Sequence, residues 1–140
     1  MAEKERKEVL RRDKWQCQGE NCVAEKVYGT RIEWGNQFNV QAAHYPEKHK
    51  PYIDKDIDNA RCLCLSCHII EEIQRNNHKG VQLLYEGHTF RNRDWLQENG
   101  WRDQRMSLQW YYDVAFYMEK GDIPAVEGLI CAAQDYFGLG

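Results

Sequence analysis

Long apolar runs are missing from this sequence. No stretch approaches the roughly 20 apolar residues that a membrane span requires, and residues 1–17 carry charges where a signal peptide needs an apolar segment. We therefore expect a cytoplasmic protein with no membrane partner. In that reducing compartment, the six cysteines are expected to be metal ligands or buried thiols rather than disulfides.

A large excess of charge of either sign is missing as well. The formal net charge is −3, which gives no overall attraction to nucleic acid. Positive residues are nevertheless crowded near the N-terminus, where Arg11, Arg12 and Lys14 end a segment rich in Lys and Glu. We expect DNA, if it is the partner, to bind at such local patches through these side chains.

Internal repeats and low-complexity tracts are also missing, and 140 residues suffice for one compact core. Residues 3–13 predict a charged helix with Val9 and Leu10 as its apolar anchors. Residues 23–38 give mixed signals and favour short β-type segments around turns.

The middle of the chain predicts two strands followed by a helix. FNVQAAHY (38–45) alternates in polarity and favours a strand that ends near His44, and NARCLCL (59–65) favours a second strand. SCHIIEEIQRNN (66–77) favours a helix that Ser66 would cap.

The remainder of the chain is rich in aromatic residues and predicts mainly helical structure. One helix is expected to stop at Gly121, and the next has Pro124 in its first turn and Gly138 past its end. The Trp and Tyr residues are expected to form core or an interface with a protein partner. We therefore divide the chain into residues 1–78 and an extension, 79–140, packed on or next to them.

The cysteines fall into two close pairs. Zn²⁺ favours four thiolates in a tetrahedron, which two such pairs supply, so we expect a structural zinc held by Cys17, Cys22, Cys64 and Cys67. Cys62 would share a strand face with Cys64, which leaves open which of the two is the ligand. Cys131, in an apolar helix, is expected to be a buried thiol.

The string Cys64-Leu-Ser-Cys67-His68 also matches a haem attachment site. Covalent haem of this type is normally attached outside the cytoplasm, so we expect no haem.

These motifs together resemble the HNH nuclease family over residues 5–75. VLRRDKWQC leads into the first cysteine pair, a strand ends in His44, and DNARCLCLSCH carries an asparagine and the second pair. The resemblance implies a ββα-metal core stapled by structural zinc, in the α+β class, and a metal-dependent DNA endonuclease.

The resemblance also implies roles for individual side chains. His44 would be the general base that takes a proton from water, Asn59 would orient His44, and His68 would bind Mg²⁺ or another divalent cation. Phosphodiester hydrolysis needs such a base, and a cation to neutralise charge on the phosphate.

One position departs from the family pattern. The residue before the base is usually an Asp or His that binds the catalytic metal, and here it is Ala43. Glu72, one helical turn after His68, or Glu71 would be a replacement ligand. An acid from the loop, among Asp54, Asp56 and Asp58, is the other alternative.

Three hypotheses follow from this combination. The first is a metal-dependent endonuclease that hydrolyses DNA. The second is a catalytically inactive HNH-like scaffold, such as a phage-type inhibitor or accessory protein, that binds a protein through its aromatic C-terminal region. The third is a zinc nucleic-acid-binding module without hydrolysis, for which binding should depend steeply on salt.

Overall fold

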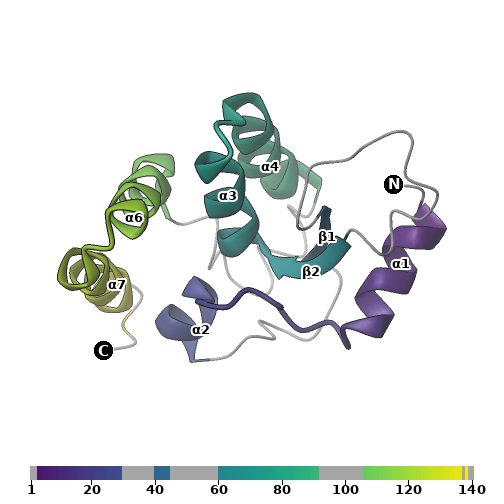
Figure 1. Cartoon of the computed structure of the whole chain (residues 1–140), viewed down its shortest axis with the longest axis horizontal. Coiled ribbons are helices and arrows are strands. Elements are labelled where there is room, and N and C mark those ends of the chain that lie inside the picture. The colour runs from purple at the N-terminus through teal and green to yellow at the C-terminus, as the bar shows by residue number, and fades with distance from the viewer. Residues whose placement is uncertain (1–2, 30–39, 45–59, 92–105, 137, 139–140) are drawn as a thin grey trace.

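The computed structural model describes residues 3–29, 40–44, 60–91, 106–136 and 138, and it shows an α+β architecture (Figure 1). The order of strand, strand and helix predicted for the middle of the chain is confirmed. None of the described helices is both long and apolar enough to cross a bilayer. The elements are α1 (Glu3–Arg12), α2 (Val23–Tyr28), β1 (Val40–His44), β2 (Ala60–Cys64), α3 (Leu65–Gln74), α4 (His78–Arg91), α6 (Leu108–Lys120) and α7 (Ile123–Tyr136).

An antiparallel hairpin of β1 and β2 stands at the centre of the fold. Its register runs from the pair of Val40 and Cys64 to the pair of His44 and Ala60. Helix α1 packs against the hairpin through Leu10, which is buried with Val40 and Cys62. Helix α3 follows β2 directly and lies on the side of the hairpin away from α1 (Figure 1).

The largest apolar cluster lies where α3 meets the C-terminal helices. Leu65 and Ile69 of α3 are buried there together with Tyr111 of α6 and Ile130 of α7. The ring of Tyr111 meets that of Tyr85 edge-on at 6.5 Å between centroids. This cluster therefore draws on both segments of the chain, and the division into 1–78 and 79–140 stays a prediction.

The C-terminal end of α6 agrees with the predicted stop at Gly121, whereas its N-terminal cap was not singled out from the sequence. Ser107 caps its first turn by accepting a hydrogen bond from the backbone N–H of Trp110. Gly121 ends the helix in the left-handed conformation, with φ at +70°. Helix α7 then begins at Ile123, which places Pro124 in its first turn as expected.

The β-type structure expected at the start of residues 23–38 is wrong, because Val23–Tyr28 is helix α2. Cys22 caps this helix, and Gly29 closes it with φ at +83° and a backbone hydrogen bond to Glu25. Val23 and Val27, four residues apart, are therefore buried on the same side. The rest of that prediction, residues 30–38, lies outside the described residues.

The turn after α1 holds two consecutive non-glycine residues in the left-handed region. Lys14 has φ at 56° and Trp15 has φ at 61°. The backbone N–H of Trp15 donates to the carbonyl of Leu10 at 2.9 Å, which closes the helix end. This turn directs the chain toward Cys17, and it does so at some cost in backbone energy.

Replacing Lys14 with glycine is expected to stabilise the protein. The left-handed conformation costs an L-residue roughly 1–2 kcal/mol, and the greater entropy of unfolded glycine offsets part of that gain, which leaves about 0.5–1 kcal/mol. Chemical denaturation of Lys14→Gly beside Lys14→Ala measures the effect. The alanine variant removes the same charge and keeps the strain, so an equal gain in both would contradict the explanation.

Candidate metal centre

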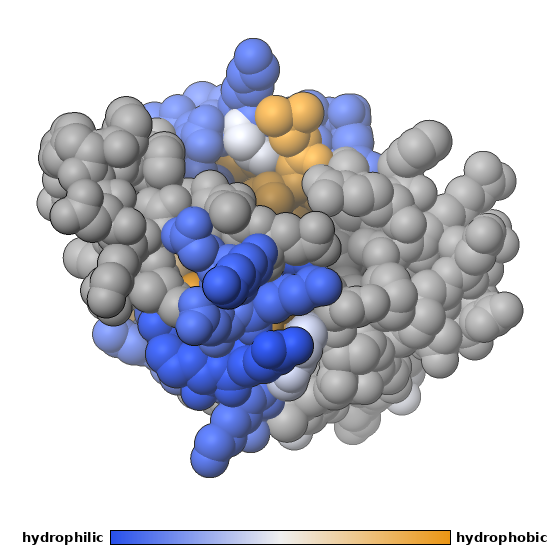
Figure 2. Space-filling view, turned by 90° about the vertical axis from the view of Figure 1, so that its right-hand side faces the viewer, coloured by the Kyte–Doolittle hydropathy of each residue, from blue (hydrophilic) through white to orange (hydrophobic). Residues whose placement is uncertain are grey.

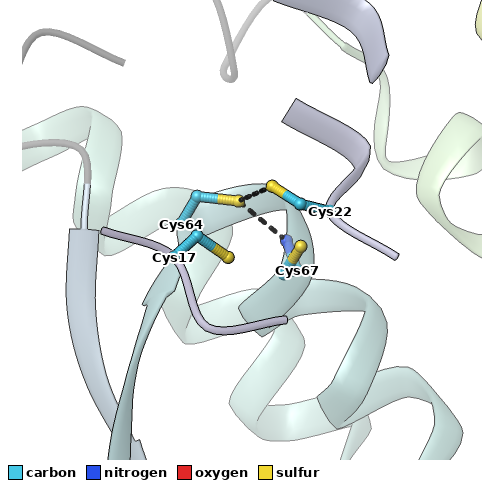
Figure 3. Close-up of side chains that lie close together, drawn as sticks. All are labelled: Cys17, Cys22, Cys64 and Cys67. Atoms are coloured by element: carbon cyan, nitrogen blue, oxygen red, sulfur yellow. Dashed lines mark hydrogen bonds between the residues drawn. The ribbon is translucent and has the colours of Figure 1, made fainter. Parts of the chain in front are cut away.

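Four cysteines from separate parts of the chain converge on one point. Cys17 comes from the loop after α1 and Cys22 precedes α2, while Cys64 ends β2 and Cys67 lies in the first turn of α3 (Figure 3). Their four sulfur atoms all lie within 4.8 Å of one another. The two predicted pairs therefore form a single cluster.

The spacing of these sulfur atoms fits a tetrahedral zinc ion. Zinc–sulfur bonds of about 2.3 Å in a tetrahedron place the sulfur atoms about 3.8 Å apart. Cys22 Sγ and Cys64 Sγ lie 3.9 Å apart (Figure 3). The donor set, four thiols and nothing else, is also the one typical of structural zinc sites.

Backbone N–H groups point at three of the sulfur atoms. Gly19 donates to Cys17 Sγ at 3.4 Å, Glu25 to Cys22 Sγ at 3.4 Å, and Cys67 to Cys64 Sγ at 3.5 Å. Such donors and helix N-termini stabilise negative charge on sulfur. The cluster is thus prepared for thiolates, which are the forms that bind a metal.

The cap of α3 differs from the one predicted. Cys64, not Ser66, is the N-cap residue, and Ser66 lies buried inside the first turn. Strand β2 ends at Cys64 and helix α3 begins at Leu65, so no loop residue between them is available to act as the cap. One cysteine sulfur therefore both caps α3 and joins the cluster.

Gly19 was not singled out from the sequence, yet it determines how closely the first loop approaches the cluster. A Cβ atom at this position would lie 3.3 Å from Cys67 Sγ and 3.4 Å from Cys17 Sγ. These distances are tighter than ordinary van der Waals contact, so a larger residue would push the sulfur atoms apart. The sequence did offer a signal for this close approach, because Gly19 lies between the two predicted ligands Cys17 and Cys22.

The protonation of the four thiols is strongly interdependent. Hydrogen bonds from Cys22, Cys64 and Cys67 hold the pKa of Cys17 far below its usual range. Contact with Cys17 in turn raises the pKa values of Cys64 and Cys67 well above theirs. Four thiolates this close repel one another, and a divalent cation that prefers sulfur removes that repulsion.

The other two cysteines stay outside the cluster. Cys62 is fully buried with Leu10 and Val40, and burial raises the pKa of its thiol to about 12. This placement decides between Cys62 and Cys64 in favour of Cys64. The expectation of a buried Cys131 is wrong, because this residue is exposed; its neighbour Ile130 occupies the buried side of α7.

His68, the predicted ligand for a catalytic cation, is paired with a residue that sequence reasoning missed. Its Nδ1 lies 2.6 Å from Oε1 of Gln41 in β1. When Nδ1 carries the proton and donates it to this oxygen, the contact fixes the tautomer in which Nε2 is the unprotonated ring nitrogen. The sequence offered one signal for Gln41: it is a polar residue inside a short predicted strand, and it lies two positions before Ala43.

Ala43 occupies the space beside the cysteine cluster. It is buried with Cys17, Cys22 and Leu63. A larger acidic or imidazole side chain at this position would displace that packing.

The two acidic residues of α3 are already paired. Glu72 is buried, and it accepts hydrogen bonds from Arg75 Nη1 at 3.2 Å and from Asn77 Nδ2 at 2.5 Å. Glu71 lies 2.9 Å from Arg61 and 2.6 Å from Arg75. Among the described residues, the four cysteines are the one group of three or more side chains placed to hold a metal ion.

The remaining predicted catalytic residues are only partly described. The backbone of His44 ends β1 opposite Ala60, and its side chain lies outside the described residues. Asn59 lies outside them as well, as do Asp54, Asp56 and Asp58. Their roles stay predictions.

No protein-family model, curated protein or solved structure matches this chain. The centre is therefore interpreted from its own geometry, which is an antiparallel hairpin followed by a helix beside four convergent cysteines. That arrangement is consistent with structural Zn²⁺.

The basic residues at the end of α1 and in the turn after it lie on the outer surface of the molecule. Arg11, Arg12 and Lys14 are exposed, and hydrophilic residues gather on the face where α1 lies (Figure 2). Arg12 is also a structural link, because its guanidinium donates to Asp13 at 2.9 Å and to the carbonyl of Ala60 at 2.6 Å. Asp13 in turn accepts from the backbone N–H of Cys62 at 2.8 Å, which ties the end of α1 to β2.

Proposed function

We propose that the four cysteines hold a structural zinc ion and that β1, β2 and α3 form an HNH-type module that hydrolyses DNA. The hairpin and helix follow one another in the order of a ββα-metal core, and the zinc cysteines flank them. The module would position one histidine at the end of β1 and another in the first half of α3.

The observation that carries this proposal is the contact between His68 and Gln41. A histidine that binds a metal ion almost always donates its other ring N–H to an oxygen atom, which fixes the tautomer and the orientation of the ring. Gln41 Oε1, 2.6 Å from Nδ1, is such an oxygen. Because a partly buried histidine needs such a partner on structural grounds as well, the contact supports a metal-binding role in combination with the order of β1, β2 and α3.

The proposed roles follow from the chemistry of phosphodiester cleavage. His44 takes the proton from the attacking water, and Asn59 holds the imidazole of His44 in position. His68, with Glu72 as the candidate second ligand, holds Mg²⁺ or another divalent cation, which when bound neutralises charge on the phosphate and the leaving oxygen. Glu72 must then exchange part of its pairing with Arg75 and Asn77 for the cation.

The outer side of α1 supports DNA as the partner. Lys4, Lys7 and Arg11 are exposed and recur at helical spacing, and Lys14 follows them in the turn. Such a stripe contacts phosphates, which positions the protein without specifying a sequence. Arg12 contributes mainly by anchoring α1 to the hairpin.

Purified protein is expected to cleave supercoiled plasmid in the presence of Mg²⁺, Mn²⁺ or Ni²⁺. His44→Ala should lower the rate by about 10²–10⁴-fold, because that is the usual contribution of a general base. His78→Ala is the matched control, since His78 is exposed and stacks on Tyr112 away from the cysteines. Both variants should retain about one zinc ion per chain.

A second candidate function is a non-hydrolytic scaffold that binds a protein or nucleic acid. Two observations favour it, namely the burial of Ala43 beside the cysteines and the pairing of Glu72 with Arg75 and Asn77. A folded, zinc-containing protein that leaves plasmid intact with every metal would reject the nuclease. If that protein binds DNA with a steep salt dependence, it is the nucleic-acid-binding module. If it shows no such binding, it is the protein scaffold.

A further inference from the structure

The segment that follows α1 covers the edge of β2 that does not pair with β1. The carboxylate of Asp13 accepts from the backbone N–H of Cys62 at 2.8 Å, and the backbone N–H of Gln18 donates to the carbonyl of Cys62 at 2.8 Å. Both backbone groups of Cys62 therefore point away from β1. An edge strand presents such groups in a row, and segment 13–18 satisfies them where a third strand would otherwise pair.

Arg12 extends this cover to the first residue of β2. Its Nη2 donates to the carbonyl of Ala60 at 2.6 Å. The same guanidinium binds both carboxylate oxygens of Asp13, through Nε at 2.9 Å and through Nη2 at 3.1 Å. This two-point contact fixes the plane of the guanidinium and thereby its direction toward Ala60. Arg12 and Asp13 thus hold β2 as one unit, which we call the edge clasp.

The inner half of the edge clasp is shielded from solvent. The side chain of Asp13 is 12% exposed, whereas that of Arg12 is 43% exposed. Burial raises the pKa of Asp13, but hydrogen bonds from Arg12 and from the backbone N–H of Cys62 lower it further, so the net direction is downward. Asp13 therefore stays ionised, and its charge-assisted hydrogen bonds are stronger than those of a fully exposed pair.

The edge clasp acts at the end of the hairpin that carries two candidate catalytic residues. Ala60 lies opposite His44 in the register of the two strands. Asn59 directly precedes Ala60 in the sequence. By holding the carbonyl of Ala60, Arg12 fixes the strand end that pairs with His44 and follows Asn59.

We infer that Arg12 is a positioning residue for the cleavage reaction rather than a contact for DNA. This role rests on the proposed function, because it concerns the placement of His44 and Asn59. Sequence reasoning grouped Arg12 with Arg11 and Lys14 as contacts for DNA. A misplacement of about 1 Å can lower a rate by about 10²-fold, so loss of the edge clasp lowers kcat. Loss of a phosphate contact that only positions the substrate raises KM instead.

Steady-state cleavage of plasmid by Arg12→Gln and Arg11→Gln tests this role. Arg11 is the matched control, because it is the adjacent basic residue and is exposed. We expect Arg12→Gln to lower kcat by about 10–100-fold with KM nearly unchanged. Arg11→Gln should raise KM several-fold with kcat nearly unchanged. Arg12→Lys should be about as slow as Arg12→Gln, because an ammonium keeps the charge that suits a phosphate and loses the planar fork.

Asp13→Asn provides a second variant that keeps much of the local structure. Asparagine retains an oxygen that accepts from the N–H of Cys62, and it loses the ion pair with Arg12. We expect its kcat to fall as in Arg12→Gln, and the double variant to be no slower than either single variant, because the two side chains act as a unit. Melting temperature and zinc content verify that each variant is folded.

Amide exchange at Cys62, followed by NMR, reports the edge clasp without any substrate. Exchange should be several-fold faster in Arg12→Gln and Asp13→Asn than in Arg11→Gln or the wild type. Equal exchange in the two arginine variants, wild-type kcat in Arg12→Lys, or a change in KM alone in Arg12→Gln would overturn the inference while the wild type still cleaves. A wild type that leaves plasmid intact would instead reject the nuclease, and with it the catalytic role of Arg12.

Discussion

Replacement of Cys64 with serine is expected to abolish zinc binding and unfold the protein. Structural zinc contributes an apparent 10–16 kcal/mol, roughly, in small zinc domains, which matches or exceeds the whole stability of about 5–15 kcal/mol typical of a domain. Serine is itself a favourable N-cap residue, so the variant retains the cap of α3 and removes the metal ligand. Circular dichroism and zinc analysis of the purified variant measure both effects.

The control for this experiment is two residues away. Cys62 is equally buried and lies outside the cluster, so Cys62→Ala should retain about one zinc ion per chain and lose only about 1–2 kcal/mol of packing. Addition of a strong chelator to the wild-type protein should reproduce the result of Cys64→Ser. A Cys64→Ser protein that keeps its zinc and melts near the wild type would contradict a structural role for the cluster.

Replacement of Tyr111 with alanine is expected to give the largest loss from the apolar core. Tyr111 is 0% exposed, and its ring meets Tyr85 of α4 and its neighbour Trp110 edge-on. Removing a buried aromatic side chain costs about 3–5 kcal/mol, because burial is lost and a cavity remains. Chemical denaturation measured by circular dichroism gives the change in the free energy of unfolding.

Phe116→Ala, on the same helix, is the matched control. Phe116 is 51% exposed, with the Lys120 ammonium 4.3 Å from its ring centroid, so its removal should cost less than about 1 kcal/mol.

Because Tyr111 belongs to the same cluster as Leu65 and Ile69 of α3, zinc release and loss of helix should occur in one transition. Two separate transitions in Tyr111→Ala would show that residues 79–140 fold as an independent unit.

Several features of this fold are local, and for that reason the sequence predicts them. The helix at residues 3–13 and the C-terminal end of α6 depend on side chains within one or two turns of each other. The two cysteine pairs are local as well, since each pair lies within one short loop or helix start. Their convergence follows from chemistry, because tetrahedral thiolate coordination needs both pairs at one point.

Other features depend on contacts between distant residues, and pattern alone misjudges them. The valines of α2 suit strands and favour a β-type prediction, while its helical form is stabilised by the Cys22 cap at its start and by burial of Val23 and Val27 along one side. Cys131 was mistaken for a buried residue because an apolar helix does not reveal which side faces the core. Tertiary packing decides both.

The sequence by itself determined the order of strand, strand and helix in the middle of the chain and the presence of two cysteine groups suited to zinc, since both follow from local pattern and ligand chemistry. Only the tertiary structure decided that Cys64, rather than Cys62, joins the cluster. It also decided that Gln41 meets His68 across 27 positions of sequence and that Arg12 binds the hairpin. Burial and pairing arise between elements, and no local pattern encodes which distant group a side chain meets.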